Sequence, residues 1–488
     1  MGITIVGLGP GDPALLTLQA WDLLSQAGEI YLRTRRHPTV AGLPQGVVLH
    51  SFDDLYDRAA DFSAVYQAIA GQILALGRRP GGVVYAVPGH PLVGEASVQL
   101  VLQDAAAEGL PVRLVDGLSF IEPVLDQLGL DALAGLQLAD ATDLAAAHHP
   151  ALDPDRPALI GQLYSRRLAS EVKLTLINAY PEEHPVTLVR AAGSSQASRV
   201  ILPLYELDRR DEVDHLTALY LPPLSTAAGG GLPTLQDTVA RLRAPDGCPW
   251  DREQTHRSLR STLLEEAYEV LAALDAEDDE QLEEELGDLL MQVAMHVQIA
   301  TEEGAFRFAD VIARIDAKLK RRHPHVFGGL QVRDSDEVLR NWEAIKVEER
   351  QAGAGAGQKT SPLGGVPPIL PALARAQALG ERAARAGFDW PDVDGVLAKV
   401  AEEAGELAAA GNEEDREEEL GDLLFALANL ARWHKLDAEM ALRQAADRFT
   451  RRYARLAELL AARGGDLRQL TLAERKVLWR EARPAEKE

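Results

Sequence analysis

An acidic pattern that occurs twice limits the structures open to this chain more than any other feature. Its first copy, Glu-Glu-Ala-Tyr-Glu at 265–269, is followed by Glu-Leu-Gly-Asp at 285–288. Its second copy, Glu-Glu-Ala-Gly-Glu at 402–406, is followed by Glu-Leu-Gly-Asp at 419–422. Residues three apart share a face of an α-helix, so each copy predicts acidic faces on two helices. The repetition predicts two related helical units in the second half of the chain.

Convergence of these acids would need a counter-ion, because four neighbouring carboxylates repel one another. Magnesium prefers hard oxygen ligands such as carboxylates, phosphate oxygens and water. Each copy therefore predicts a divalent-metal site. The alternative is that the acids form a solvated helix face, which is the usual explanation of an isolated acidic run on an alanine-rich helix. The second copy, and the Glu-x-x-Asp partner in both, favour the metal site.

The first part of the chain alternates strand and helix signals. Residues 3–8 form a short apolar run that leads into Gly9-Pro10-Gly11-Asp12-Pro13, and a helical pattern follows. A helix is predicted at 94–108. Further strands are predicted at 83–87, 112–115, 158–160, 187–189 and 198–202. This alternation predicts an α/β domain whose ligand lies at the carboxyl ends of the strands.

Two breaker segments, 225–233 and 352–371, separate three parts of the chain. The first is rich in small residues, and the second combines an Ala-Gly repeat with several prolines. Between and after them the pattern is helical, and a length of 488 residues suits about three domains. We therefore predict an α/β domain at 1–224, and all-α repeats at 233–350 and 368–488.

Basic and aromatic residues follow the acids in the same order in both repeats. A basic pair comes first, and a tryptophan with a basic residue four positions later comes second. These residues are Lys318, Arg322, Trp342 and Lys346 in the first repeat, and Arg448, Arg452, Trp479 and Arg483 in the second. Basic side chains can clamp phosphate oxygens, and a tryptophan can contact a base. The alternatives are surface charge pairing for the basic residues and core or interface packing for the tryptophans.

Composition excludes several classes of protein. The formal net charge of −25 opposes a general nucleic-acid binder, whose surface must be basic. A single cysteine, Cys248, cannot form a disulfide framework and suits a reducing compartment. The chain contains no long apolar run of the kind that spans a membrane. We expect a cytoplasmic protein.

Residues 233–488 resemble tandem MazG-type nucleoside triphosphate pyrophosphohydrolases, an all-α family that cleaves triphosphates to the monophosphate and pyrophosphate. Beyond the acidic pattern, the resemblance is carried by Gly247-Cys248-Pro249-Trp250-Asp251, by Arg321 to Phe327 and, in the second repeat, by Gly387-Phe388-Asp389-Trp390. It implies Mg²⁺ as cofactor and nucleoside triphosphates as substrates. Helical sites of this kind usually need neighbouring helices to close them, so we also expect a homodimer.

The resemblance assigns roles to individual residues. The implied metal ligands are Glu266, Glu269, Glu285 and Asp288, with Glu403, Glu406, Glu419 and Asp422 in the second repeat. Glu265 and Glu402 would lie just outside the metal ligands or orient water. Lys318, Arg322, Arg448 and Arg452 would contact phosphate, and Trp342, Lys346 and Trp479 would line the substrate site. Arg448 stands where the family usually has lysine, which keeps the charge and changes the geometry. Both repeats keep all four acids, so the sequence leaves open which repeat is active.

Residues 2–222 resemble the tetrapyrrole (corrin/porphyrin) methylases, which bind S-adenosylmethionine between two α/β lobes. The resemblance is carried by Gly7-Leu-Gly9-Pro10-Gly11-Asp12-Pro13, Leu16-Thr17-x-x-Ala20, Pro88-Gly89-His90-Pro91 and Gly117-Leu118-Ser119. Glycine allows a ligand to approach the backbone closely. It implies a cofactor site formed by Gly7, Gly9, Pro10, Gly11, Asp12, Pro88, Gly89, Gly117 and Ser119. Two alternatives to a hydrolase therefore stay open. One is an S-adenosylmethionine-dependent methyltransferase with a regulatory, nucleotide-binding helical half, and the other is a non-catalytic helical scaffold.

Overall fold

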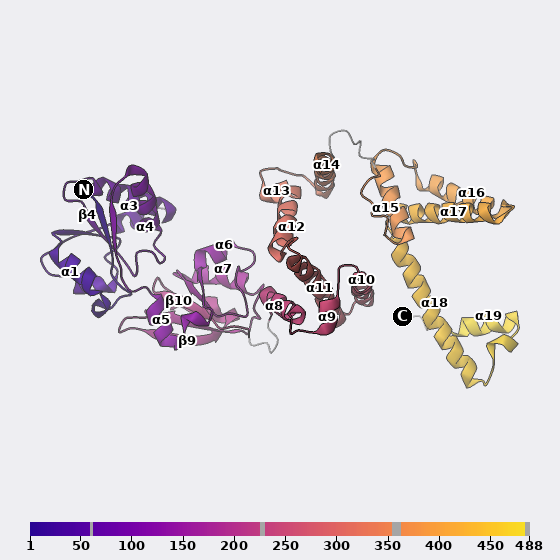
Figure 1. Cartoon of the computed structure of the whole chain (residues 1–488), viewed down its shortest axis with the longest axis horizontal. Coiled ribbons are helices and arrows are strands. Elements are labelled where there is room, and N and C mark those ends of the chain that lie inside the picture. The colour runs from indigo at the N-terminus through magenta and orange to yellow at the C-terminus, as the bar shows by residue number, and fades with distance from the viewer. Residues whose placement is uncertain (59–61, 225–229, 354–362, 484–488) are drawn as a thin grey trace. The chain divides into compact units, whose positions relative to one another are not determined.

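The computed structural model describes residues 1–58, 62–224, 230–353 and 363–483 (Figure 1). The chain divides into two compact units, Met1–Ala313 and Arg314–Glu488, which are described separately. Parts of the predicted breaker segments, 225–229 and 354–362, lie outside the described residues, as does the end of the second predicted repeat, 484–488. None of the described helices is both long and apolar enough to cross a bilayer.

The first lobe is built on a parallel sheet of five strands in the order β3-β2-β4-β1-β5. The strands are β1 (Ile3–Gly7), β2 (Glu29–Leu32), β3 (Val48–Ser51), β4 (Val83–Val87) and β5 (Val112–Val115). The helices of this lobe are α1 (Leu18–Gln26), α2 (Asp53–Arg58), α3 (Phe62–Gly77) and α4 (Ala96–Glu108). The predicted strands at 3–8, 83–87 and 112–115 are confirmed, and the predicted helix begins at Ala96.

Helices cover both faces of this sheet, which explains why its strands are apolar on both sides. Ile3, Ile5 and Tyr85 face α3 and α4 in one buried cluster. Val6 and Ala86 belong to a second cluster, which contains residues of α1. Alternate strand residues therefore supply two cores, and the carboxyl ends of the strands remain available for a site.

The second lobe contains a mixed sheet in the order β6-β7-β10-β8-β9. Only the β6–β7 pair is parallel, and the other three pairs are antiparallel. The strands are β6 (Gln137–Asp140), β7 (Ala158–Gly161), β8 (Pro185–Arg190), β9 (Ser198–Pro203) and β10 (Thr217–Leu221). The helices are α5 (Ile121–Leu128), α6 (Ala141–Ala146) and α7 (Arg166–Leu176). Sequence reasoning missed β2, β3, β6 and β10, which have only four or five residues each.

Short 3-10 helices join several of these elements. They are η1 (Pro13–Leu15), η2 (Pro38–Gly42), η3 (Ala132–Ala134) and η4 (Leu204–Arg209), with η5 (Leu467–Gln469) near the end of the chain. Asp12 caps η1, because its carboxylate accepts a hydrogen bond from the Ala14 backbone N–H at 2.9 Å.

All described elements after β10 are helical, as the sequence predicts. In the first unit they are α8 (Leu232–Arg243), α9 (Pro249–Glu253), α10 (Arg260–Ala276) and α11 (Asp279–Glu302), and α12 (Phe308–Arg322) crosses the boundary between units. The second unit adds α13 (Pro324–Phe327), α14 (Ser335–Gly353), α15 (Ala372–Arg385), α16 (Val393–Ala409), α17 (Glu413–Trp433), α18 (Ala438–Ala462) and α19 (Leu472–Glu481). The predicted fold class, an α/β domain followed by helical repeats, is therefore confirmed.

The two acidic patterns fall on matching helical hairpins. The pair α10 and α11 carries the first copy, and the pair α16 and α17 carries the second. Helices α10 and α16 each have 17 residues. The second helix of each hairpin begins at a side-chain cap: Asp278 accepts from the Gln281 N–H, and Asn412 accepts from the Asp415 N–H. Each cap fixes the residue at which the second helix begins. It thereby fixes which turn of that helix lies opposite the acids of the first helix.

Candidate functional sites

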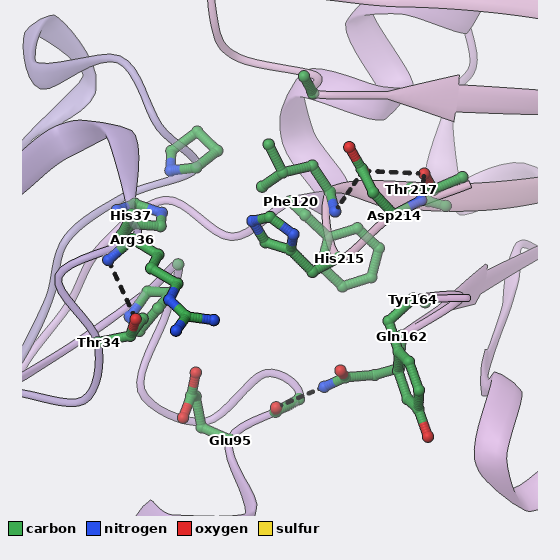
Figure 2. Close-up of a pocket in the computed structure, with 18 of the residues that line it drawn as sticks. Thr34, Arg36, His37, Glu95, Phe120, Gln162, Tyr164, Asp214, His215 and Thr217 are labelled. Atoms are coloured by element: carbon green, nitrogen blue, oxygen red, sulfur yellow. Dashed lines mark hydrogen bonds between the residues drawn. The ribbon is translucent and has the colours of Figure 1, made fainter. Parts of the chain in front are cut away.

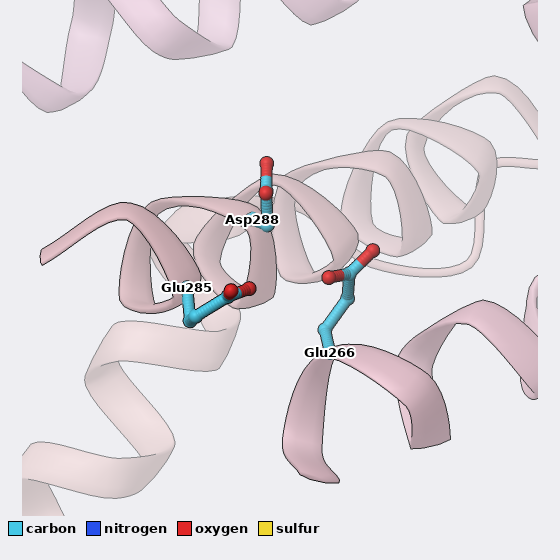
Figure 3. A group of neighbouring side chains, drawn as sticks. All are labelled: Glu266, Glu285 and Asp288. Atoms are coloured by element: carbon cyan, nitrogen blue, oxygen red, sulfur yellow. The ribbon is translucent and has the colours of Figure 1, made fainter. Parts of the chain in front are cut away.

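The first acidic cluster joins carboxylates from two helices. Glu285 and Asp288 lie one turn apart on α11, and Glu266 of α10 points toward the same space (Figure 3). Carboxylate oxygens of these three residues lie within 4.8 Å of one another. Glu269 is the fourth predicted ligand, and its charge also acts on Glu266. The hairpin therefore brings the predicted acids of this repeat together.

The second cluster has the same construction. Oxygens of Glu403 and Glu406 on α16 and of Glu419 on α17 lie within 4.8 Å of one another. Asp422, the remaining predicted ligand, contributes to the electrostatic field at Glu419. Glu403 is only 4% exposed, and a carboxylate that is buried so far needs a compensating charge.

The negative charges of neighbouring carboxylates raise the pKa of one glutamate in each cluster. Burial raises the pKa of Glu266, and the charges of Asp288, Glu269 and Glu285 raise it further. The pKa of Glu419 is raised in the same way, by burial and then by Glu406, Glu403 and Asp422. A close set of oxygen donors from carboxylates, with excess negative charge, is the donor set that a hard divalent cation requires. The residues present fit Mg²⁺ in both repeats.

A lysine distinguishes the second cluster from the first, and sequence reasoning missed it. The Lys399 ammonium lies 2.9 Å from Glu402 Oε1 and 2.7 Å from Glu403 Oε1. Hydrogen bonds to Glu403 and Glu402 raise the pKa of Lys399, so it stays charged. The corresponding position of the first repeat is Thr262. Alignment of the two copies could have revealed this difference, because Lys399 lies three and four residues before the acids it contacts.

In the first repeat, the predicted basic and tryptophan residues pair across α12 and α14. The Lys346 Nζ lies 3.5 Å from the centre of the Trp342 ring, and the Arg322 guanidinium lies 5.9 Å from it. Arg322 also forms an ion pair with Glu349 at 2.6 Å. Lys318 is half-buried on α12. In this structure Arg322 is thus paired with an acid, as the alternative of surface charge pairing predicts. Arg322 and Lys346 also line a cavity of about 370 Å³.

Two further arginines, Arg382 and Arg385 of α15, line the same cavity. Four basic side chains therefore face two acids, Glu349 and Glu381, among its lining residues. Sequence reasoning missed this contribution of α15, since nothing in the local pattern indicates which helix packs beside α14.

In the second repeat, Arg452 of α18 contacts Trp479 of α19. The Arg452 Nε donates a hydrogen bond to the Trp479 carbonyl oxygen at 2.8 Å, and its guanidinium lies 4.2 Å from the indole ring centre. Trp479 also packs against a small buried cluster that contains Leu456 and Leu478. Arg448 is exposed on α18. Both repeats therefore bring an arginine and a tryptophan together, as their common order suggests.

The glycines predicted to bind the cofactor converge at the carboxyl ends of β1, β4 and β5. A Cβ atom on Gly117 would lie 2.5 Å from the Gly89 carbonyl oxygen and 2.8 Å from the Gly7 carbonyl carbon. Gly9 and Gly89 also exchange backbone hydrogen bonds, at 3.2 and 2.9 Å. Three chain segments can approach this closely only because these positions have no side chain.

A cavity of about 650 Å³ lies between the two lobes, next to these turns. Pro10, Pro88 and Gly89 of the predicted cofactor set line it. Ser119 instead lies just before α5, where its hydroxyl donates to Glu122 Oε2 at 2.6 Å and accepts from the Ile121 backbone N–H at 2.9 Å. Asp12 caps η1, as described above. The structure therefore gives these two predicted residues local structural contacts, and Gly89 is the predicted glycine that lines the cavity.

Most polar residues that line this cavity were missed by sequence reasoning (Figure 2). Arg33, Arg36 and His37 follow β2, Glu95 precedes α4, and Asp214 precedes β10. Glu95 is 6% exposed and pairs with Arg33 at 3.0 Å. The only sequence signal was the run of basic residues directly after β2, a strand that the sequence did not reveal.

Comparison with known families matches both parts of the chain. The model of the MazG nucleotide pyrophosphohydrolase domain matches residues 254–327 and 393–457, which contain the two acidic hairpins. The model of the tetrapyrrole (corrin/porphyrin) methylases matches residues 2–208.

Individual relatives match either the whole chain or about half of it. The uncharacterized protein YabN of Bacillus subtilis is 40% identical over 492 residues, which is 99% of each chain. The nucleoside triphosphate pyrophosphohydrolase of Escherichia coli is 45% identical over 254 residues, covering 51% of this chain and 95% of its own. The MazG nucleoside triphosphate pyrophosphohydrolase/pyrophosphatase of Thermotoga maritima is 43% identical over 250 residues, covering 51% and 94%.

Among solved structures, a uroporphyrin-III C-methyl transferase of Thermus thermophilus, complexed with S-adenyl homocysteine, is similar at 23% identity and a TM-score of 0.35, covering 46% of this chain and 97% of its own. On the family models and the relatives, the chain belongs to the MazG nucleotide pyrophosphohydrolase family, in a form that carries a tetrapyrrole methylase domain before its two MazG repeats.

Proposed function

We propose that this protein is a Mg²⁺-dependent nucleoside triphosphate pyrophosphohydrolase that clears nucleotides from the cellular pool. One observation carries the proposal: two matching hairpins each gather carboxylate oxygens within 4.8 Å of one another. Such crowding is costly unless a cation is shared. The relatives named as nucleoside triphosphate pyrophosphohydrolases match this helical half.

The helical residues would divide the work as follows. Glu266, Glu269, Glu285 and Asp288, with their counterparts Glu403, Glu406, Glu419 and Asp422, would hold the ions. Bound Mg²⁺ neutralises phosphate charge and makes a coordinated water a better nucleophile. Glu265 and Glu402 would orient that water. Lys318, Arg322, Arg448 and Arg452 would bind phosphate oxygens, which carry the negative charge that builds up during cleavage.

A triphosphate panel tests the proposal. The full-length protein with Mg²⁺ should release pyrophosphate, rather than orthophosphate, from at least one nucleoside triphosphate. Glu266→Gln and Glu403→Gln should each remove the contribution of one repeat, and the double variant should lose more than about a hundred-fold in rate. Loss in only one single variant would identify the active repeat.

Matched controls are available two residues before the α11 and α17 ligands. Glu283→Gln and Glu417→Gln each remove one exposed carboxylate, from α11 and from α17, at positions outside the clusters. They should keep full activity. Unchanged activity in the double cluster variant, or orthophosphate as the released product, would refute the assignment.

A second activity is favoured by the cavity between the lobes of the N-terminal domain. We propose that this cavity binds S-adenosylmethionine, because two of the three glycine turns line it, through Pro10 and through Pro88 and Gly89, and because the domain matches the tetrapyrrole methylases. Calorimetric titration of the full chain with S-adenosylhomocysteine tests this binding. Absence of any heat of binding would exclude the methyltransferase alternative without affecting the hydrolase.

We further propose that the protein is a cytoplasmic homodimer with domains at 1–224, 233–350 and 368–488. Support for the dimer comes from leucines on the outer faces of the acidic hairpins. Leu286 and Leu290 of α11 are 48% and 44% exposed, and Leu420 and Leu424 of α17 are 47% and 43% exposed. Exposed leucines at the same positions of both hairpins are typical of faces that pack against further helices.

A further inference from the structure

One end of the cavity between the lobes contains polar atoms that the protein leaves without partners. Among the described residues, no group forms a hydrogen bond with Glu95 Oε2, Arg33 Nε or His37 Nδ1, although these atoms are buried. All three residues line the cavity. Buried polar groups are normally paired, and leaving them unpaired costs stability. A ligand that supplies a donor to Glu95 Oε2, an acceptor to Arg33 Nε and a further polar atom to His37 Nδ1 would satisfy this end of the cavity.

The charges around the cavity exclude a strongly acidic ligand. Its lining contains two arginines, Arg33 and Arg36, and three carboxylates, Asp53, Glu95 and Asp214. Burial, followed by the charges of Arg33 and His215, lowers the pKa of His37 to about 4, so His37 is neutral at physiological pH. A polycarboxylate would therefore find too few basic partners here, and a neutral ligand fits better.

The Arg33–Glu95 pair also restricts the charge that the ligand can carry. Its two members are joined by Arg33 Nη1 and Glu95 Oε1 at 3.0 Å, which leaves Arg33 Nε as a donor and Glu95 Oε2 as an acceptor. Because each member already neutralises the other, a charged ligand would leave one of them without its partner. A neutral ligand can bind both without breaking the pair.

Aromatic side chains line the cavity beside these polar groups. Phe120 and Tyr164 lie on the side of the second lobe (Figure 2), and Tyr66 lines the cavity as well. Gly161 leaves room for the Phe120 ring, since a Cβ atom there would lie 2.7 Å from it. Aromatic faces next to a few hydrogen-bonding groups are typical of sites for flat heterocycles.

We propose that the Arg33–Glu95–His37 end of the cavity binds a neutral, nucleobase-type heterocycle, which donates an N–H to Glu95 and accepts a hydrogen bond from Arg33. An amino group beside a carbonyl or ring nitrogen provides this combination, and guanine and cytosine both carry it. The assignment names the second ligand of the domain, and so it rests on the proposal that this cavity is the methylase-type ligand site.

Calorimetric titration of the full-length protein, saturated with S-adenosylhomocysteine, tests the assignment with guanosine, cytidine and uroporphyrin as probes. Guanosine or cytidine should bind to the loaded protein, and uroporphyrin, with its eight carboxylates, should not displace it. Failure of both nucleosides to bind would overturn the assignment. Nucleoside binding to the free protein that is lost once S-adenosylhomocysteine is bound would overturn it too, because the heterocycle site would then be the adenine site of the cofactor.

The experiment distinguishes absence of S-adenosylhomocysteine binding from absence of heterocycle binding. If S-adenosylhomocysteine gave no heat of binding, the same nucleoside titrations on the free protein would still decide whether a heterocycle binds. Pyrophosphate release by the helical half is measured in the same samples and reports only on the hydrolase.

Two variants assign the contacts. Glu95→Gln should weaken nucleoside binding about ten- to a hundred-fold, as expected for loss of one hydrogen bond to a charged group. Glu108→Gln is the matched control, because it removes the carboxylate of an exposed Arg–Glu pair in the same domain, Arg78–Glu108, and should leave binding unchanged. Equal binding by Glu95→Gln and Glu108→Gln would refute the role of Glu95.

His37→Leu covers the case in which Glu95→Gln does not fold, since Glu95→Gln leaves Arg33 as a buried charge. His37→Leu removes an unpaired buried polar atom, so its melting temperature should equal or exceed that of the parent. Its nucleoside affinity should nevertheless fall about tenfold. A purely structural role for His37 predicts the opposite, a lower melting temperature with unchanged affinity, and that result would overturn the assignment.

Discussion

At the scale of single residues, the two metal-site candidates differ most at Lys399. Its ammonium contacts Glu402 and Glu403 in the second repeat, and the first repeat has Thr262 at this position. A lysine and a divalent cation would neutralise the same carboxylates, so they compete for Glu403. The two repeats should therefore respond differently to magnesium, although their acids are the same.

Lys399→Met should lower the melting temperature of the metal-free protein, because Glu402 and Glu403 lose their counter-ion. Addition of Mg²⁺ should then raise the melting temperature more than it does in the parent protein. Differential scanning fluorimetry with and without Mg²⁺ measures both effects. Lys476→Met, at an exposed lysine of α19, is the control. Equal magnesium responses in the parent and Lys399→Met would show that Lys399 does not compete with the cation.

Glu349 makes the pairing of α12 with α14 dependent on pH. Hydrogen bonds from Arg322 lower the pKa of Glu349 to about 2. Burial acts against this shift, and a hydrogen bond from Arg321 adds to it. A depressed pKa in the folded state gives stability that is present above the unfolded value of 4.5 and is lost as the pH falls toward 2.

Glu349→Gln should therefore lower stability by about 0.5–1 kcal/mol at pH 7, which is the range for an ion pair that solvent partly screens. The difference between variant and parent should shrink as the pH falls below 4.5. Thermal melts between pH 3 and 7 measure it, and the adjacent exposed acid provides the control Glu348→Gln. A difference that does not change with pH would show that charge pairing is not its origin.

At the scale of elements, the N-terminal domain depends on the close contact of three strand ends. The turns after β1, β4 and β5 meet at Gly7, Gly89 and Gly117, where the backbones leave no room for a side chain. The contact also affects the cavity between the lobes, because Gly89 lines it. A change in these turns should therefore alter both stability and ligand binding.

Gly117→Ala should destabilise this domain by about 1–3 kcal/mol or more, since the added methyl group would overlap the backbone of Gly89. It should also weaken binding of S-adenosylhomocysteine. Calorimetry of unfolding and binding measures both effects. Gly71→Ala on α3 is the control, because a Cβ atom there meets nothing within 4 Å and should stabilise the helix by about 0.5–1 kcal/mol. Equal stability of the two variants would contradict the contact.

At the scale of the whole molecule, the helical half buries fewer of its apolar side chains than the N-terminal domain does. Large buried clusters fill both lobes, whereas the clusters within the helical half are small. The exposed leucines of α11 and α17 occupy the same positions in the two hairpins. Faces of this kind are usually covered by other helices, and a second copy of the chain would supply them.

Sedimentation should therefore give twice the chain mass of 52.9 kDa for the parent protein. The double variant Leu420→Lys/Leu424→Lys should dissociate toward the single chain, because burying two lysines in an apolar interface is strongly unfavourable. Leu133→Lys is the control, since Leu133 is 94% exposed in the N-terminal domain. A parent protein that sediments at 52.9 kDa would refute the dimer.

The sequence by itself determined what depends on local spacing. Glu285 and Asp288 share a helix face because of the helical period, and the short turn between α10 and α11 places Glu266 opposite them. The α/β class, the helical repeats and the predicted strands at 83–87 and 112–115 followed from the same kind of pattern. Lys399 could have been found in this way, since it lies one turn before its partners.

Only the tertiary structure decided which distant residues meet. Arg33 and Glu95 follow or precede different elements, and no spacing in the chain indicates that they form a buried pair facing Asp214 and Phe120 of the other lobe. The four short strands escaped prediction because so few residues carry no clear periodicity. A local pattern sets which side chains share one element, whereas a cavity between two lobes depends on long-range packing, which the chain specifies only as a whole.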